Sequence, residues 1–135
     1  MTPKEYLSQY QQLNREIDRL LEEKERWTAL ATRITPSQSE GGRGSGSQNG
    51  RIPSAVEKIM ETEDKINSRI DRLVELRQEI ESRLDELPDG KQKEVLHRRY
   101  ILCQTLERIA DKMNYSYMQI CRINGRALQE FGKML

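Results

Sequence analysis

The chain has 135 residues, of which 35% are hydrophobic and 33% are charged. Globular chains are roughly 45–50% apolar, so the composition disfavours one thick core and favours long helices that are each buried along one stripe. No segment approaches the roughly 20 apolar residues that cross a bilayer, and the N-terminal residues lack the apolar stretch of a secretory signal. We therefore expect an all-α, soluble, intracellular protein without a membrane partner.

Charge is unevenly distributed along the chain, although the net charge is only +1. Residues 1–87 contain 14 Lys and Arg against 17 Asp and Glu, whereas residues 88–135 contain 9 against 5. A basic segment that follows a mildly acidic body indicates contact between the C-terminal third and a polyanion.

The first predicted helix covers about residues 3–34. From Tyr6 to Ile34, apolar residues recur at alternating spacings of four and three, and only Lys24 interrupts them. This repeat of 3.5 residues is typical of a coiled-coil seam. The helix is predicted to end at Thr35-Pro36, because a proline disfavours the helical conformation of the residue before it.

A segment rich in Gly and Ser follows, at about residues 35–53, and is predicted to be a flexible loop. Ser54 is the predicted N-cap of a second helix. A second seam, in which mostly apolar residues recur at alternating spacings of three and four, runs from Val56 to Leu87. Pro88-Asp89-Gly90 is a stop-and-turn signal that ends it.

Two seams of similar length joined by a flexible loop predict an antiparallel coiled-coil hairpin over residues 1–87. In the predicted register, residues whose numbers add to about 90 face each other, such as Tyr10 and Ile80. Lys24 and Glu63 then fall in adjacent layers, where they can form an ion pair, and Arg77 lies within the seam. The alternative is that each seam pairs with a second copy of the chain, which would make a homodimer.

Residues 88–135 predict a separate bundle of short helices. One helix covers 91–100, a second covers 106–113 after the N-cap Thr105, and a third begins after Ser116. A short helix, a turn of about three residues and a capped second helix form a helix-turn-helix, whose second helix enters the major groove of DNA. A three-helix bundle that binds another protein is the alternative interpretation.

The residues on the outer face of the last helix are the candidate base readers. Gln has the donor and acceptor to pair with adenine, and Arg has those to pair with guanine. Tyr and Met side chains contact thymine methyl groups or sugars, and the neighbouring cations contact phosphates. The candidate DNA-binding residues are Tyr117, Met118, Gln119, Arg122 and Arg126 on this helix, with Lys112, Arg108 and Arg99 for the phosphates.

The segment from Leu87 to Leu128 resembles region 4 of bacterial sigma-70 factors. The matching residues are Val95-Leu96, Arg99-Tyr100, Leu106-Glu107, Ile109-Ala110, Ser116, Ile120, Ile123 and Ala127-Leu128. It departs from that pattern at Tyr117, Met118 and Cys121, where sigma factors usually carry Arg and Glu. No sigma region 2 is present, so the resemblance implies an activator or an adaptor rather than a complete sigma factor.

Nearly the whole chain also resembles small phage and prophage proteins of Gram-positive bacteria, of the RinA/ArpU kind. This resemblance implies a DNA-binding transcriptional regulator of phage or prophage genes in the bacterial cytoplasm. Its partners would be double-stranded DNA, host RNA polymerase and a second copy bound through the coiled coil. The alternatives are an interaction adaptor of the anti-sigma or anti-repressor type and a small terminase-like DNA-packaging protein.

Catalytic and metal chemistry have little support in the sequence. His97 stands alone among arginines, and Cys103 and Cys121 lack the spacing of zinc ligands. The two cysteines have no readable His or Asp partners, so they are predicted to be small apolar fillers. We therefore expect no enzymatic activity, no metal and no cofactor.

Overall fold

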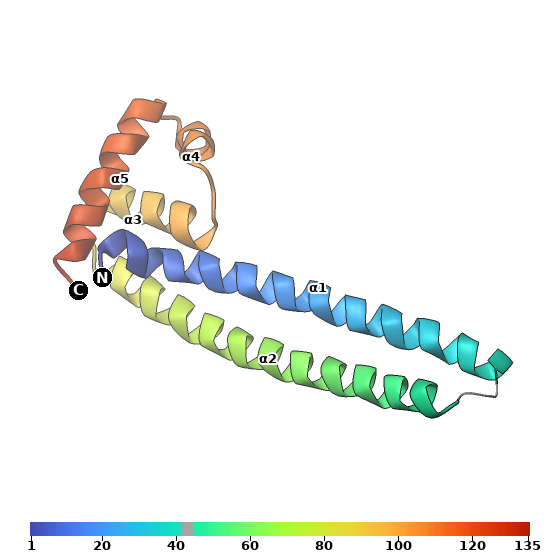
Figure 1. Cartoon of the computed structure of the whole chain (residues 1–135). Helices are drawn as coiled ribbons and strands as arrows, with labels where there is room; N and C mark the ends of the chain where they lie inside the picture. The colour runs from blue at the N-terminus through green and yellow to red at the C-terminus, as the bar shows by residue number, and fades with distance from the viewer. Residues whose placement is uncertain (42–44) are drawn as a thin grey trace. The chain divides into compact units, whose positions relative to one another are not determined.

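The computed structural model describes residues 1–41 and 45–135, with side chains for residues 1–33 and 54–135. The described elements are all helical: α1 (Pro3–Gly41), α2 (Ser45–Asp85), α3 (Gly90–Leu96), the π-helix η1 (His97–Ile101), α4 (Leu106–Met113) and α5 (Tyr117–Gly132) (Figure 1). The predicted all-α class is confirmed. No helix in this part of the chain has the length and apolar character needed to cross a membrane.

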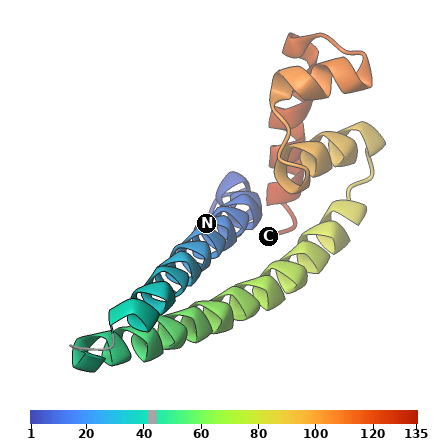
Figure 2. The same cartoon turned by 90° about the vertical axis from the view of Figure 1, so that its right-hand side faces the viewer.

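Helices α1 and α2 form an antiparallel pair within one chain, as the sequence predicted (Figures 1 and 2). The predicted ion pair between them is present, with Lys24 Nζ 3.3 Å from Glu63 Oε1. A second bridge joins Arg69 Nε to Glu16 Oε1 at 2.7 Å. In the predicted register, residues 66 and 74 of α2 face Lys24 and Glu16. The actual partners, Glu63 and Arg69, come three and five residues earlier, about one helical turn, which these long side chains can span.

Part of the second predicted seam is buried as predicted, at Ile66, Ile80, Leu84 and Leu87, whereas the remaining buried positions of α2 are shifted by one residue. Ala55, Thr62 and Leu76 are buried, whereas Val56 and Ile70 of the predicted seam are exposed. This shift leaves Glu63 and Arg77 at the edge of the seam, where Glu63 pairs with Lys24 and Arg77 Nη1 donates to the Tyr10 phenol oxygen at 3.4 Å. Their charges are thereby spared the cost of burial. Thr62 tolerates its buried place because its hydroxyl donates to the carbonyl oxygen of Lys58 at 2.7 Å.

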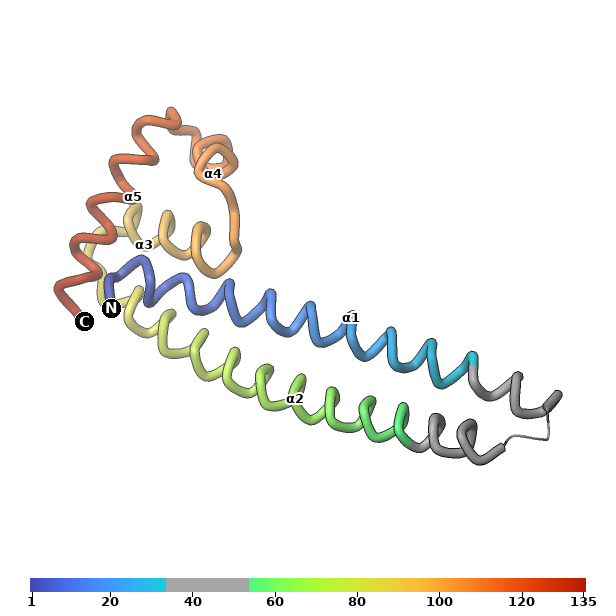
Figure 3. Tube along the Cα trace, viewed as in Figure 1, coloured from blue at the N-terminus to red at the C-terminus, as the bar shows by residue number. Residues whose placement is uncertain are grey.

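Both long helices extend beyond their predicted ends. Helix α1 continues through Thr35-Pro36 to Gly41, and α2 begins at Ser45 rather than after Ser54. A proline inside a helix removes one amide hydrogen bond without always ending the helix, so the sequence signal was not decisive. The predicted loop at about residues 35–53 lies outside the residues whose side chains are described (Figure 3).

The chain divides into two compact units. The helix-pair unit is Arg15–Asp71, and the core unit combines Met1–Asn14 with Arg72–Leu135. This grouping places the first turns of α1 with the short helices, whereas the sequence predicted a boundary near residue 87. Whether residues 88–135 act as a separate DNA-binding domain stays a prediction.

Two apolar clusters hold the core unit together. The larger joins the first turns of α1 and the last turns of α2 to α3, η1 and α5, and its fully buried members include Leu7, Leu84 and Phe131. The rings of Tyr6 and Phe131 lie 5.8 Å apart. The smaller cluster joins α3, α4 and α5. The first residues of the chain are therefore part of the core that supports the last helix.

Candidate nucleic-acid interface

Helices α4 and α5 form the predicted helix-turn-helix. Thr105 caps α4 by accepting a hydrogen bond from the amide of Arg108 at 3.2 Å. Asn114 ends α4 in the left-handed conformation, with φ 59°, which Asn adopts more readily than most residues. Ser116 then caps α5. Each of these local signals was readable in the sequence, and the turn forms where it was predicted.

The smaller apolar cluster fixes the angle between α4 and α5. Its buried members are Val95, Ile109, Ala110 and Ile120. Ala110 is only 4% exposed, so its small side chain lies where the helices approach each other, as the sequence predicted. The outer face of α5 is thus presented on a packed scaffold rather than on a loop.

The structure exposes seven of the eight predicted DNA-binding side chains: Tyr117, Met118, Gln119, Arg122, Arg126, Lys112 and Arg108. Met118 is 65% exposed and Tyr117 is 48% exposed, which is high for large apolar side chains. Arg99 differs, because it is half-buried and its Nη1 donates to the carbonyl oxygen of Gln104 at 3.1 Å. That contact engages Arg99 in the connection before α4 and makes it a poor phosphate ligand.

The Lys and Arg side chains of residues 72–135 fall into two sets. The first set contacts a carboxylate or a backbone carbonyl: Arg72, Arg77, Arg83, Lys93, Arg98, Arg99 and Lys133. The second set has no ion pair within the described residues: Lys91, Arg108, Lys112, Arg122 and Arg126. These five side chains, the unpaired cations, lie on α4, on α5 and at the start of α3. These five cations therefore carry no ion pair, although the carboxylates of Glu107 and Asp111 on α4 reduce the net positive charge around the helix-turn-helix.

A cleft of about 360 Å³ brings three of the predicted DNA-binding residues together with five residues that were not predicted to bind DNA. Gln119, Arg122 and Arg126 line it from one face of α5, and Ile123 lies between them on that face. Lys91 and Tyr115 line it from α3 and from the turn. Tyr117 and Met118 lie outside this cleft.

Lys91 is held over the ring of Tyr115, with its Nζ 5.4 Å from the ring centre. A hydrogen bond with the Tyr115 phenol raises the pKa of Lys91 above its usual value, so the side chain stays charged. The acid in the lining, Asp89, accepts hydrogen bonds from the amides of Lys91 and Gln92 and thereby caps α3. The lining is therefore net positive, with three cations and one carboxylate.

The first turn of α5 contains two polar contacts that bear on the predicted readers. Gln119 and Ser116 form a capping box: the Ser116 amide donates to Gln119 Oε1 at 2.9 Å, and the Gln119 amide donates to Ser116 Oγ at 3.2 Å. The phenol of Tyr117 lies against Cys121, and a hydrogen bond with that thiol raises the pKa of Tyr117 above its usual value. Two of the five candidate readers on α5 therefore already have partners on that helix.

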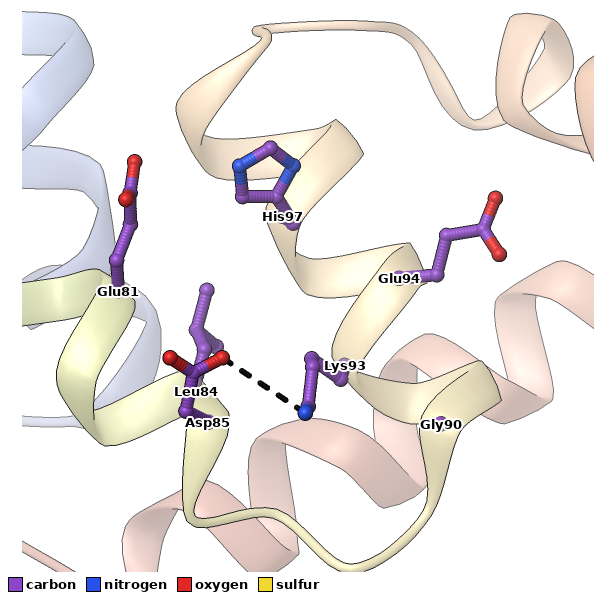
Figure 4. A pocket seen from close by; sticks show the side chains of 7 residues that line it. All are labelled: Glu81, Leu84, Asp85, Gly90, Lys93, Glu94 and His97. Carbon is purple, nitrogen blue, oxygen red and sulfur yellow. Dashed lines mark ion pairs between the residues drawn. The ribbon is translucent and has the colours of Figure 1, made fainter.

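A second pocket, of about 300 Å³, lies between the end of α2 and α3 and contains none of the predicted residues (Figure 4). Lys93 Nζ lies 3.7 Å from Asp85 Oδ1 at one side of it. Glu81 and His97 project from different helices on the other side. In the part of the chain that the structure describes, no three His, Cys, Asp or Glu side chains are grouped as metal ligands.

Residues 83–130 match the family model described as Sigma-70, region 4. The matched segment begins in the last turn of α2 and ends in α5, so it includes the whole helix-turn-helix. The comparisons with curated proteins and with solved structures find no match. Residues 83–130 are thus similar to sigma-70 region 4, which supports a role in DNA binding and transcription and confirms that part of the predicted resemblance.

Proposed function

We propose that this protein is a sequence-specific DNA-binding transcriptional regulator that reads the major groove with α5. The observation that carries the proposal is the position of the unpaired cations, which gather on α4, on α5 and at the start of α3 of a region 4 helix-turn-helix. Cations without carboxylate partners are free to neutralise phosphates and release their counterions. The exposed side chains of α5 supply the sequence readout.

The proposal assigns a role to each residue of the interface. Tyr117, Met118, Gln119, Arg122 and Arg126 were predicted to face the bases, and of these Arg122 and Arg126 have the free guanidinium that guanine recognition requires. Arg108 and Lys112 contact phosphates, and Lys91 joins them. Arg99 is left out because it is bonded to the Gln104 carbonyl.

The finer parts of the proposal concern the biological setting. The resemblance to RinA/ArpU proteins supports control of phage or prophage genes in the cytoplasm of a bacterial host. The region 4 match supports cooperation with RNA polymerase. In this setting residues 88–135 bind DNA, and the helix pair of residues 1–87 mediates dimerisation or contacts the polymerase.

Selection of random duplex DNA by the purified full-length chain, at near-physiological salt, tests the proposal. We expect an enriched motif, and two half-sites about 10 bp apart would indicate a symmetric dimer. The mass of the eluting protein should be recorded in the same experiment. A ring of many subunits would favour the terminase-like alternative, and polymerase binding without DNA affinity at low salt would favour the adaptor.

A pair of variants separates base reading from phosphate contact. Arg122→Ala should cost about 1–3 kcal/mol of binding free energy on the selected sequence and relax the preference at one position. Lys112→Ala should weaken binding to all sequences by a similar factor, because phosphates carry no sequence information. If both variants bind DNA as the parent chain does, α5 is not the recognition helix.

A further inference from the structure

Gln119 has the chemistry of an adenine reader, but the structure gives its side chain a different task. Its Oε1 accepts a hydrogen bond from the backbone amide of Ser116 at 2.9 Å, while the backbone amide of Gln119 donates to the Ser116 hydroxyl at 3.2 Å. We propose that Gln119 is a positioning residue that fixes the first turn of α5, and that Met118 and Arg122 read the bases in its place. The inference rests on the proposed DNA binding and assigns the specificity of that site.

The capping contact conflicts with recognition of adenine by Gln119. Two-point recognition requires Oε1 to accept from the adenine amino group while Nε2 donates to the ring nitrogen N7. Here Oε1 points back at the first residue before α5, and this bond fixes the plane of the whole amide. To read adenine, Gln119 would have to break the cap.

The capping box fixes the backbone that carries the two proposed readers. The first amides of a helix have no partner within it, and the paired side chains of Ser116 and Gln119 satisfy two such donors in this turn. Met118 lies within the capped turn, and Arg122 follows one turn later. The two side chains therefore lie on the same side of α5, with a spacing that the cap keeps constant.

The chemistry of the two readers determines the expected motif. Met118 is 65% exposed and offers an apolar, adaptable surface that suits the methyl group of thymine. Arg122 is exposed and has no ion pair among the described residues, so both of its terminal donors can face guanine. We infer a core motif in which thymine and guanine occupy neighbouring base pairs.

The first experiment compares the selected motif of the parent chain with those of Ser116→Ala, Gln119→Ala and Gln119→Glu. The two alanine variants should keep the motif and lose affinity by a similar factor, about twofold to tenfold, because each removes one half of the same cap. Gln119→Glu should keep both the motif and the thermal midpoint, because Glu completes a capping box as well as Gln does. Its added charge should weaken binding equally on all sequences.

The opposite result would show that Gln119 reads a base. In that case both Gln119 variants would lose the preference for one adenine that Ser116→Ala retains, since a carboxylate cannot donate to adenine N7. If the parent chain selects no motif, the proposed function fails and this inference fails with it. If the parent chain selects a motif that the Gln119 variants change, only the inference fails.

The second experiment tests Met118 through the DNA rather than through the protein. Replacing single thymines of the selected site by deoxyuridine removes only the methyl group. We expect one such replacement to weaken the parent chain about threefold to fivefold, as loss of one buried methyl predicts, and to leave Met118→Ala unchanged. Two results would overturn the role of Met118. In one, no deoxyuridine replacement weakens binding by the parent chain. In the other, a replacement weakens the parent chain and Met118→Ala by the same factor.

Discussion

The two units of the chain are built from similar helices but are stabilised in different ways. In the described residues, the largest fully buried side chains all belong to the core unit, among them Leu7, Ile80 and Phe131. Among its described side chains, the helix-pair unit buries only Ile17, Ala55, Thr62 and Ile66, and it has ion pairs across its interface. Packing therefore dominates one unit, and a narrow seam with exposed charge pairs dominates the other.

The difference also concerns where positive charge is compensated. In the helix-pair unit, Lys24 and Arg69 face carboxylates of the opposite helix, whereas Arg15, Arg19, Arg26 and Lys65 have no ion pair among the described residues. In the core unit, the unpaired cations remain around the helix-turn-helix. Repulsion between these cations lowers the free energy of unfolding, and we expect the packing of the apolar core to offset this loss. The comparison separates residues that hold the structure from residues that are available to a partner.

The largest expected effect concerns the packing of α1 in the core unit. Leu7 is fully buried and Leu21 is 43% exposed on the same helix, so they form a matched pair. Leu7→Ala should lower the free energy of unfolding by about 2–5 kcal/mol, because it leaves a cavity beside Phe131. Leu21→Ala should cost less than about 1 kcal/mol. Urea unfolding of both variants would show whether the first turns of α1 belong to the core, and equal losses would contradict it.

A second expected effect is a loss of stability at high pH through Tyr6. Burial and a hydrogen bond of 2.6 Å to Glu79 raise the pKa of Tyr6 to about 12. Because this value lies above the 10.0 of an unperturbed phenol, the contribution is complete below pH 10 and is lost as the pH rises through 12. Unfolding free energies measured across this range should fall less steeply for Tyr6→Phe. An identical slope would show that the phenol has no such role.

The local signals of the core unit were readable from the sequence, whereas its long-range contacts were not. Thr105, Ser116 and the left-handed Asn114 act on their own neighbours, so the helix-turn-helix was predictable. The capping box of Gln119 also has a sequence signal, a Ser followed three residues later by a Gln. The same Gln fits adenine recognition equally well, so the sequence does not separate the two roles. Lys91 was missed because only the fold brings the start of α3 beside α5.

The long helices show the same limit of sequence reasoning. Their antiparallel pairing follows from two apolar seams, but the predicted seam on α2 is correct only in part, because Ile66 and Ile80 are buried whereas Val56 and Ile70 are exposed. The charged residues Glu63 and Arg77 were the available signal, since a buried seam seldom includes charges at such positions. The burial of both Tyr6 and Leu7 has no periodic signature, because neighbouring residues of a helix point in different directions.

A smaller effect is expected at the cleft beside α5, where Lys91 and Lys93 form a second matched pair on one helix. Lys91 lies over Tyr115 without an ion pair among the described residues, whereas Lys93 pairs with Asp85. Lys91→Ala should weaken binding to all DNA sequences and reduce the salt slope by about 1, the effect of one phosphate contact. Lys93→Ala should leave the slope unchanged. DNA titrations between low and physiological salt would measure the salt slopes of both variants. Equal slopes would show that Lys91 makes no phosphate contact.

The smallest expected effect lies in the helix-pair unit, at the bridge between Lys24 and Glu63. Both side chains are more than a third exposed, so water screens their attraction. A double-mutant cycle with Lys24→Ala and Glu63→Ala should give a coupling of about 0.2–1 kcal/mol at low salt, and nearly none at 1 M salt. A coupling that persists at high salt would mean that the bridge is shielded from solvent. The helix pair would then resemble the core unit more closely than its thin seam indicates.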